Sequence, residues 1–208
     1  MPIGVLVLGV LGFAWVQQSG FLVTEFESML SSASQGSGQS SGKSTGPVAT
    51  AAHGTVETAG GGIPARPSGA VPMTVEHVHD GDTLFLRTDQ PNALVATTDA
   101  VKVRLLGIDT PEVGDSAECF GDQAAEQLRE LLPDGSRTWV TVDQDSTDRY
   151  GRSLFYLWTG DGRFVNYELV AGGAAESLMI PPNDAHYPLL RTAEDAATTA
   201  GAGQWGAC

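Results

Sequence analysis

The C-terminal two thirds of the chain alternates short apolar runs with turns rich in Gly, Asp and Asn. Short runs that are enriched in β-branched and aromatic residues and bounded by such turns predict β-strands. The predicted strands cover residues 74–79, 83–87, 101–108, 139–143 and 153–158. Five strands of this length fit a small barrel.

Apolar positions spaced as on one face of a helix appear in three further segments. The first covers residues 124–132 and is closed by Pro and Gly, the second covers 165–171 and is closed by two glycines, and the third covers 188–198. Pro and Gly at these positions are stop signals for helices. The chain from residue 71 onward, residues 71–208, is therefore predicted to be an α+β domain with a five-stranded barrel and three helices.

The N-terminal segment has a different pattern. Residues 3–16 are apolar apart from glycines, and after Gln17, Gln18 and Ser19 the apolar character resumes as far as Val23. The run has the length of a signal-peptide core, but it lacks a positively charged start and a nearby cleavage site. Counted to Val23 it barely spans a bilayer, and the two glutamines interrupt it. Residues 1–30 are therefore predicted to be a signal peptide or a membrane anchor, and a helix of the folded domain is the third reading.

Residues 31–70 are rich in Ser, Gly, Ala and Thr and contain almost no large apolar side chains. Such a segment cannot bury a core of its own. We expect a flexible, disordered linker that separates an N-terminal apolar helix from the domain.

Candidate chemistry is concentrated where the predicted strand 101–108 ends. Arg104 offers a planar set of donors that matches phosphate oxygens. Asp109 and Glu112 offer hard oxygens that bind a divalent cation or accept a proton. Taken alone, the run is also compatible with a surface strand that has a solvated end.

Two other segments carry matching chemistry. Residues 79–83 place Asp80 and Asp82 on either side of a glycine, immediately before a strand. Residues 147–152 add further arginines and a tyrosine immediately before another strand. An acidic corner, an arginine strand and a second arginine are together what a phosphodiester site requires.

At these motifs the chain resembles the staphylococcal nuclease (thermonuclease) family. Four motifs occur in the family's order: DGDT at 80–83, RLLGIDTPE at 104–112, DRYGR at 148–152 and VNYELVAGG at 165–173. The resemblance covers the chain from about residue 71 to the end. It implies an OB-fold barrel of five strands with three helices, and Ca²⁺-dependent hydrolysis of DNA and RNA.

The resemblance also implies roles for individual residues. Asp82 and Asp109 match the carboxylate ligands of Ca²⁺, and Thr110 matches a ligand that uses its backbone carbonyl. The same oxygen donors also suit Mg²⁺ or Mn²⁺. Glu112 falls at the position of the general base. The remaining matches are Arg104 and Arg152 for the scissile phosphate, and Arg149 and Tyr150 for the terminal phosphate of the nucleotide.

Two features depart from this expectation. The family's best-studied member has two tyrosines that pack against the nucleotide, and the corresponding positions here are Leu178 and Ile180. The chain also has 11 basic and 25 acidic residues and a formal net charge of −14 at pH 7. Because Lys and Arg supply most of the non-specific affinity for nucleic acid, the broad basic face of a tight binder is missing.

The two cysteines, Cys119 and Cys208, are far apart in sequence. In an exported protein a disulfide is the favoured state of such a pair, and this bridge would tie the C-terminal tail to the domain. Two free thiols and an intermolecular bridge are the alternatives. Metal binding is not favoured, because neither cysteine has a nearby partner in the sequence.

The sequence therefore predicts an extracellular or cell-surface, Ca²⁺-dependent endonuclease acting on DNA or RNA. It is expected to be a monomer without an obligate protein partner, attached to a membrane if the N-terminal segment is retained. One alternative is a non-catalytic, nuclease-like module that binds nucleic acid or a protein at the cell surface. A surface structural domain with a vestigial site is another.

Overall fold

The structure is a computed structural model that describes residues 58–59 and 62–208. The predicted export or membrane segment, residues 1–30, and most of the predicted linker lie outside these residues. Among the helices of the described residues, none combines the length and the apolar character needed to cross a membrane.

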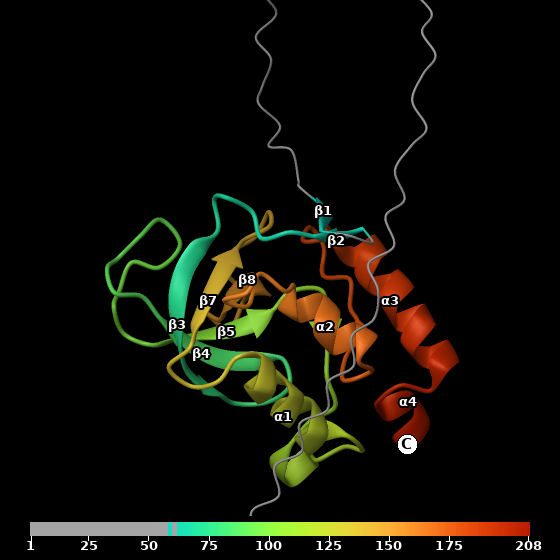
Figure 1. Ribbon diagram of the computed structural model, residues 1–208. Coiled ribbons are helices and arrows are strands. Elements are labelled where there is room, and N and C mark those ends of the chain that lie inside the picture. Colours follow the sequence, from blue (N-terminus) through green and yellow to red (C-terminus); the bar gives the residue numbers. More distant parts are fainter. Residues whose placement is uncertain (1–57, 60–61) are drawn as a thin grey trace, which may run out of the picture. The chain divides into compact units, whose positions relative to one another are not determined.

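Five strands close into a barrel, as the sequence predicts (Figure 1). Their order around the barrel is β3-β4-β5-β8-β7. All neighbouring pairs are antiparallel except β5 and β8, which are parallel. The strands are β3 (Val71–Val78), β4 (Thr83–Arg87), β5 (Val101–Leu105), β7 (Arg137–Thr141) and β8 (Ser153–Trp158).

Alternation along the strands places one set of side chains inside the barrel. Met73 and Val75 on β3, Leu84 and Leu86 on β4, and Val103 on β5 are almost completely buried. Residues i and i+2 of a strand point to the same face, so each strand contributes a row of apolar side chains to one core. The alternate positions of β4 and β5 include Thr83 and Arg104, whose side chains belong to the polar network of the site.

The predicted strand 101–108 is not continuous, and the expectation of one strand there is wrong. Gly107 has a φ of +76°, a left-handed conformation that glycine adopts without steric cost. The chain turns at this glycine, and a separate short strand follows, β6 (Ile108–Asp109). It pairs with β9 (Glu176–Ser177) outside the barrel.

In the part of the chain that the structure describes, four α-helices and one short 3₁₀ helix, Gly114–Ser116, accompany the barrel. In Figure 1, α2, α3 and α4 lie to its right and α1 lies below it. Three of them correspond to the predicted helices, and the short C-terminal one has no counterpart in the prediction. The helices are α1 (Gly121–Leu131), α2 (Val165–Ala171), α3 (Tyr187–Ala200) and α4 (Gln204–Ala207).

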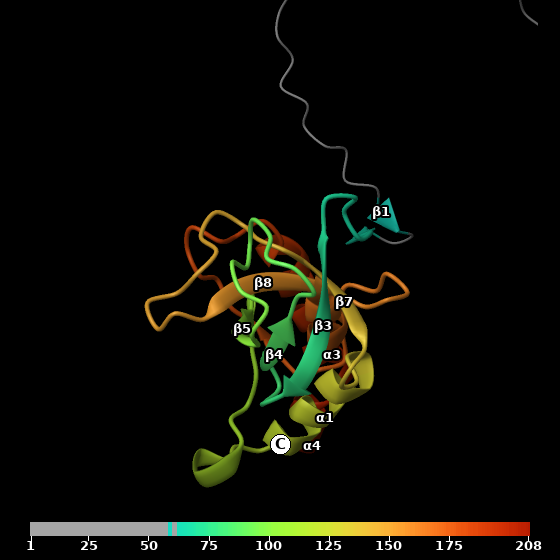
Figure 2. The same cartoon turned by 90° about the vertical axis from the view of Figure 1, so that its left-hand side faces the viewer.

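Ordered contacts begin before Val71, inside the segment that the sequence assigned to the linker. Two short strands, β1 (Thr58–Ala59) and β2 (Ile63–Pro64), pair with each other. Pro64 is buried, and its carbonyl accepts a hydrogen bond of 3.3 Å from Trp158 Nε1. The guanidinium of Arg66 lies 4.1 Å from the centroid of the Trp139 ring. These contacts fasten residues 63–66 to the barrel, close to where β7 and β8 run side by side (Figure 2).

A disulfide joins Cys119 to Cys208, with the two Cα atoms 6.0 Å apart. Of the alternatives left open by the sequence, the structure contains the intramolecular bridge. It connects the segment immediately before α1 to the residue immediately after α4.

Candidate active site

A tight turn between β3 and β4 presents Asp82. The backbone N–H of Asp82 donates to Asp80 Oδ1 at 3.0 Å, a side-chain contact that stabilises the turn. Between them, Gly81 is packed so closely that an added Cβ would lie 2.7 Å from Thr110 Oγ1 and 2.9 Å from the Cβ of Ala124. Only glycine allows the turn to approach the segment after β6 this closely.

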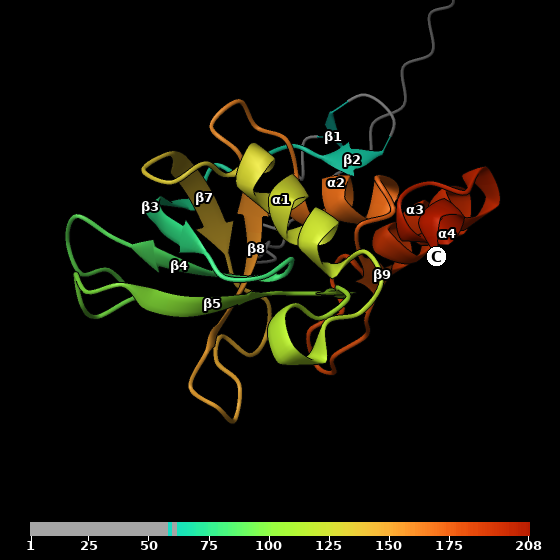
Figure 3. The ribbon, with the colours of Figure 1, turned by 90° about the horizontal axis from the view of Figure 1, so that it is seen from below.

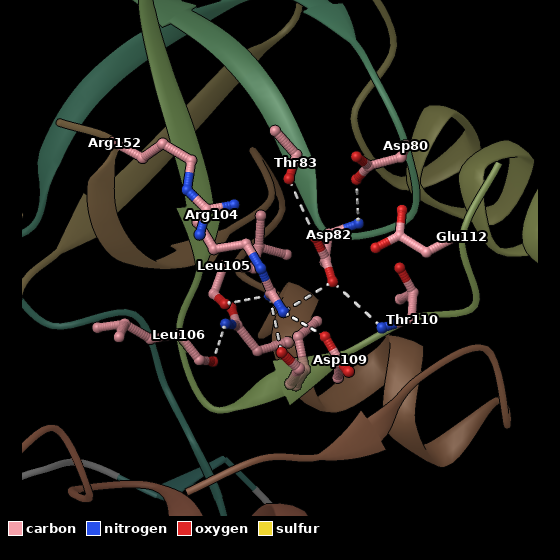
Figure 4. A network of polar contacts seen from close by, with 12 residues as sticks. Asp80, Asp82, Thr83, Arg104, Leu105, Leu106, Asp109, Thr110, Glu112 and Arg152 are labelled. Carbon is pink, nitrogen blue, oxygen red and sulfur yellow. Dashed lines mark hydrogen bonds and ion pairs between the residues drawn. The ribbon is translucent and has the colours of Figure 1, made fainter. Parts of the chain in front are cut away.

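Arg104 is the centre of the polar network in Figure 4. Its Nη2 atom lies 2.9 Å from Asp82 Oδ2 and 2.6 Å from Asp109 Oδ1. Its Nη1 atom donates to the carbonyls of Leu105 and Ile108, at 2.9 Å and 2.7 Å. Four protein oxygens thus engage the Nη groups, and within the described residues the Nε–H is left without a protein acceptor.

Asp82 is the most deeply buried carboxylate of this network. Its side chain is 9% exposed, compared with 59% for Asp109. Its oxygens accept hydrogen bonds from Thr83 Oγ1 at 3.0 Å and from the backbone N–H of Thr110 at 3.1 Å. Burial raises the pKa of Asp82 to about 6, although the Arg104 guanidinium acts in the opposite direction. The single guanidinium therefore does not fully offset the cost of burying this charge.

Asp109 is positioned by a strand pairing that the sequence does not predict. β6 pairs with β9 so that Asp109 lies opposite Glu176, and Leu178 N–H donates to the Gly107 carbonyl at 2.8 Å. Burial and the nearby charges of Glu194 and Asp109 raise the pKa of Glu176. Two-residue strands have no periodicity to detect in a sequence.

β9 is in turn attached to α3, beside which it lies in Figure 3. The buried carboxylate of Glu194 accepts hydrogen bonds from the backbone N–H and the hydroxyl of Ser177. Arg191 donates to the same Glu194 oxygen at 3.2 Å. A chain of contacts therefore leads from α3 through β9 to the strand that carries Asp109.

Glu112 begins the exposed loop that leads to α1. Figure 4 shows its carboxylate on the side of the site where Asp80 and Asp82 lie. Its backbone is bonded twice to Glu118: the Glu112 N–H donates to Glu118 Oε2 at 3.1 Å, and the Glu118 N–H donates to the Glu112 carbonyl at 2.9 Å. Glu118 was not among the residues predicted from the sequence.

Arg152 reaches the site because β8 runs parallel to β5. Val103 is paired with Ser153, so the residue before β8 lies beside the strand that carries Arg104 (Figure 4). Arg152 Nε lies 2.7 Å from Asp148 Oδ2. Partial burial disfavours the charge of Asp148, but hydrogen bonds from Arg152 and from the Tyr150 backbone outweigh it and lower the pKa of Asp148. Asp148 thus orients Arg152 as a charged partner.

Arg149 and Tyr150 lie on the same turn as Arg152. Tyr150 is 69% exposed, and the Arg149 and Arg152 guanidinium carbons lie 4.7 Å and 5.7 Å from the centroid of its ring. Arg149 Nη2 also donates to the Tyr150 hydroxyl at 2.6 Å. The turn offers an aromatic surface beside two cations, a combination that suits a nucleotide phosphate and its base.

The surface next to Asp109 is hollowed by a pocket of about 240 Å³. Three of its six lining residues are acidic, and Gln204 comes from α4 at the C-terminal end. The residues that line it are Asp109, Thr110, Pro111, Glu118, Glu176 and Gln204.

The donor chemistry of the site fits a hard divalent cation. Asp82 and Asp109 converge on one guanidinium nitrogen, and the incompletely neutralised charge of Asp82 favours a further cation. The described residues contain no cluster of three His, Cys, Asp or Glu side chains arranged to hold a metal. The predicted set needs only two carboxylates, because its third oxygen is the carbonyl of Thr110.

The structure brings most of the predicted site residues together. Hydrogen bonds link Asp82, Arg104, Asp109 and the backbone of Thr110 directly. Other predicted residues, Glu112 and Arg152, lie around this core in Figure 4, and Arg149 and Tyr150 are attached through the turn of Arg152. The arrangement can hold a cation with carboxylates, a phosphate with guanidinium groups, and a proton on an exposed carboxylate.

The loop after β9 gives the site an apolar edge. Leu178 and Met179 are 36% and 47% exposed, and Ile180 is partly buried. The positions where the resemblance implies tyrosines therefore present aliphatic side chains, which lack a π-face on which a base can stack.

A family model described as "Staphylococcal nuclease homologue" matches residues 102–207. The chain is 32% identical over 123 residues to a thermonuclease of Staphylococcus intermedius, which covers 58% of this chain and 67% of that relative. It is 30% identical over 112 residues to a thermonuclease of Staphylococcus hyicus, with 52% and 60% covered. The residues matched by the family model include Arg104, Asp109, Thr110, Glu112 and Arg152, and they begin after Asp82 and Thr83.

A third relative is much longer than this chain. The endonuclease YhcR of Bacillus subtilis (strain 168) is 34% identical over 154 residues, which make up 68% of this chain and 12% of that relative. The matched part of this chain therefore corresponds to 60–67% of the two thermonucleases but to about an eighth of the larger endonuclease.

Proposed function

Because the chain belongs to the staphylococcal nuclease homologue family, we propose that it is a Ca²⁺-dependent endonuclease that hydrolyses phosphodiester bonds of DNA or RNA. The family, with relatives named thermonuclease and endonuclease, supports the broader class of nucleic-acid hydrolase. The observation that carries the more specific proposal is the position of Arg104 Nη2, within 2.9 Å of Asp82 and 2.6 Å of Asp109.

Asp82, Asp109 and the carbonyl of Thr110 would hold the Ca²⁺, and Mg²⁺ or Mn²⁺ suits the same donors. A bound cation would supply positive charge for the phosphoryl oxygens and lower the pKa of bound water. The incompletely offset charge of buried Asp82 supports this assignment.

Protein side chains bind the phosphate and accept the proton. Arg104 and Arg152 bind the scissile phosphate and stabilise the negative charge that develops on its non-bridging oxygens. Glu112 accepts the proton of the attacking water, which is a poor nucleophile until it is deprotonated. Arg149 and Tyr150 contact a neighbouring phosphate of the substrate. The exposure of Glu112 and Tyr150 supports these roles, because both side chains are accessible from solvent.

The proposal includes a location outside the cytoplasm. Residues 1–30 export the chain or anchor it to a membrane, residues 31–70 act mainly as a linker, and residues 71–208 form the nuclease domain. The Cys119–Cys208 disulfide supports this, because such bonds persist in oxidising compartments. The enzyme acts as a monomer without an obligate protein partner.

A non-catalytic module that binds nucleic acid or a protein is the second candidate. Two observations favour the protein-binding form of this candidate: the exposed aliphatic side chains of Leu178 and Met179 after β9, and the net charge of −14. Both weaken the expected hold on a nucleic acid without removing any residue assigned to the chemistry.

One experiment separates the two candidates. The full chain is incubated with single-stranded DNA in the presence of Ca²⁺ and then with a chelator, in parallel with Glu112→Ala. We expect cleavage that needs the metal and falls by about 10²- to 10⁴-fold in the variant. Asp115→Ala, an exposed carboxylate on the same loop, is the matched control and should keep the wild-type rate. Binding without cleavage would favour the module, and an unchanged rate in Glu112→Ala would contradict the assigned base.

A further inference from the structure

The loop between Glu112 and α1 is poorly held by packing. Residues 114–119 are all exposed, and the flanking Val113 and Phe120 are only partly buried. Within the loop, Ala117 N–H donates to the Gly114 carbonyl and Gly121 N–H donates to the Glu118 carbonyl. A segment with so few buried contacts is expected to open at low free-energy cost. Its first residue is the proposed general base, whose carboxylate must keep a defined position for proton transfer.

Glu112 itself is fixed from the far end of this loop. Glu118 contributes both its backbone N–H and its carboxylate to the backbone of Glu112, at 2.9 Å and 3.1 Å. Next to it, the start of α1 lies so close that a Cβ on Gly121 would be 2.2 Å from the Glu112 carbonyl oxygen. The position of the Glu112 main chain therefore depends on the position of residues 118–121.

The C-terminal end is anchored independently of the disulfide. Gln204 N–H donates to the Gly173 carbonyl at 2.9 Å, and Cys208 N–H donates to the Gln204 carbonyl at 3.0 Å. Gly173 and Gly203 pack backbone against backbone: a Cβ on Gly173 would be 2.1 Å from the Ala202 carbonyl oxygen. Because Gly173 follows α2, this contact fixes α4 to the helical side of the domain.

We propose that Glu118 and the Cys119–Cys208 disulfide are positioning residues for Glu112. The inference rests on the proposed function, because it concerns the residue assigned there as general base. Cys119 is bonded to the anchored tail, its neighbour Glu118 is bonded to Glu112, and the two links in series hold the exposed loop against the domain. Without the bridge, the described contacts that hold the loop are its own hydrogen bonds and the partly buried side chains of Val113 and Phe120 at its ends, and the Glu112 carboxylate is less often placed for proton transfer.

The proposal makes a specific kinetic prediction. A misplaced general base lowers turnover, whereas substrate binding depends on the arginines and the cation, which the disulfide does not touch. We expect Cys119→Ser/Cys208→Ser in the full chain to lower kcat by about 10- to 100-fold with KM unchanged. Rates are measured well below the melting temperature of the variant, which is determined separately. An unchanged kcat, or a loss confined to KM, would overturn the proposal.

A double-mutant cycle distinguishes positioning of Glu112 from general weakening of the fold. If the bridge acts through Glu112, its removal in the Glu112→Ala background lowers kcat no further, because the group it positions is already absent. If its loss damages the whole site, kcat falls by the same factor in both backgrounds, and the proposal is wrong. Failure of Glu112→Ala alone to lower kcat would instead refute the base assigned under the proposed function.

Two further measurements avoid reliance on the serine variants. Glu118→Ala keeps the disulfide and removes only the side-chain link, so kcat should fall while the melting temperature changes little. Glu126→Ala, which removes an exposed carboxylate on α1, is the matched control and should leave kcat unchanged.

An added dithiol can also reduce the native bridge. It delivers two electrons and two protons to give two thiols, while the reagent becomes a disulfide. Reduction should lower kcat and reoxidation should restore it, and a rate unaffected by reduction would overturn the proposal.

Discussion

Arg104 and Asp82 form an ion pair of 2.9 Å in which each side chain is only 9% exposed. Removing one member of such a pair leaves a buried charge without a partner, which is far more costly than losing a surface contact. We expect Arg104→Met to lower the free energy of unfolding of the metal-free protein by about 3 kcal/mol or more. Urea denaturation in the presence of a chelator, at pH 7.5, measures this change.

The matched control for this prediction is an exposed pair on the same barrel. Arg87 Nε lies 3.0 Å from Glu76 Oε2, with side chains 46% and 47% exposed. Because solvent screens such a pair, Arg87→Met should cost no more than about 1 kcal/mol. Equal losses for the two arginines would contradict the view that burial gives the Arg104 pair its importance.

Gly81 provides a steric test of how Asp82 is placed. An added Cβ would lie 2.7 Å from Thr110 Oγ1, so Gly81→Ala must push the turn and Thr110 apart. We expect a loss of about 1–3 kcal/mol in the free energy of unfolding and a parallel loss of nuclease activity. Gly69→Ala, where nothing lies within 4 Å of the added atom, should change neither quantity. A fully stable and active Gly81→Ala would show that the turn need not approach Thr110.

The barrel could be predicted from the sequence because each of its strands has its own signal. β4 and β8 coincide with the predicted ranges, since both are short runs rich in apolar and aromatic residues that are bounded by turn residues. Arg104, Asp109 and Glu112 could be grouped into one candidate site because they lie within the short segment 104–112, on either side of the turn at Gly107.

The remaining features depend on contacts between distant segments. β6 and β9 contain two residues each, and their pairing places Glu176 opposite Asp109, a residue far from it in the sequence. The bonds from Glu118 to Glu112 require the loop to fold back on itself. Neither leaves a periodic pattern in the sequence, so propensity and spacing could not indicate them.

His186 gives a prediction for the dependence of stability on pH. Its ring packs against Tyr156 and Phe164, with centroids 4.5 Å and 4.9 Å away. Burial lowers the pKa of His186 below its usual value, although Asp143 acts in the opposite direction. The unfolded chain therefore binds a proton at higher pH than the folded one, and this contribution to stability is present above pH 6.5 and lost as the pH falls.

The measurement compares wild type with His186→Phe, which keeps an aromatic ring and removes the titration. Between pH 7.5 and pH 5 the free energy of unfolding of the wild type should decrease relative to that of the variant. The raised pKa of Asp82 stabilises the folded, metal-free protein against unfolding at low pH. This contribution is the same in the wild type and in the variant, so it cancels in the difference. A difference that does not vary with pH would contradict the shift assigned to His186.

Leu178 tests whether the missing aromatic side chains limit substrate binding. It is 36% exposed at the end of β9, next to the strand of Asp109. A base stacked on an aromatic side chain gains about 1–3 kcal/mol, so Leu178→Tyr should lower KM for single-stranded DNA by roughly tenfold. Leu178→Met, which adds no ring, is the control. If both variants have the wild-type KM, the substrate does not pass over this residue.

The dependence of activity on salt concentration should show how many cationic side chains contact the substrate phosphates. The chain carries 11 basic against 25 acidic residues, and the arginines assigned to substrate phosphates under the proposed function are Arg104, Arg149 and Arg152. Each neutralised phosphate of a single strand contributes about −0.7 to the slope of log affinity against log salt, so two or three contacts predict a slope between about −1.4 and −2.1. The slope is measured as log kcat/KM against log KCl at constant free Ca²⁺.

Arg149→Ala should make this slope shallower by about 0.7, whereas Arg129→Ala on α1 should leave it unchanged. A slope steeper than about −4 would require more phosphate contacts than these arginines provide, and hence a basic surface elsewhere on the chain.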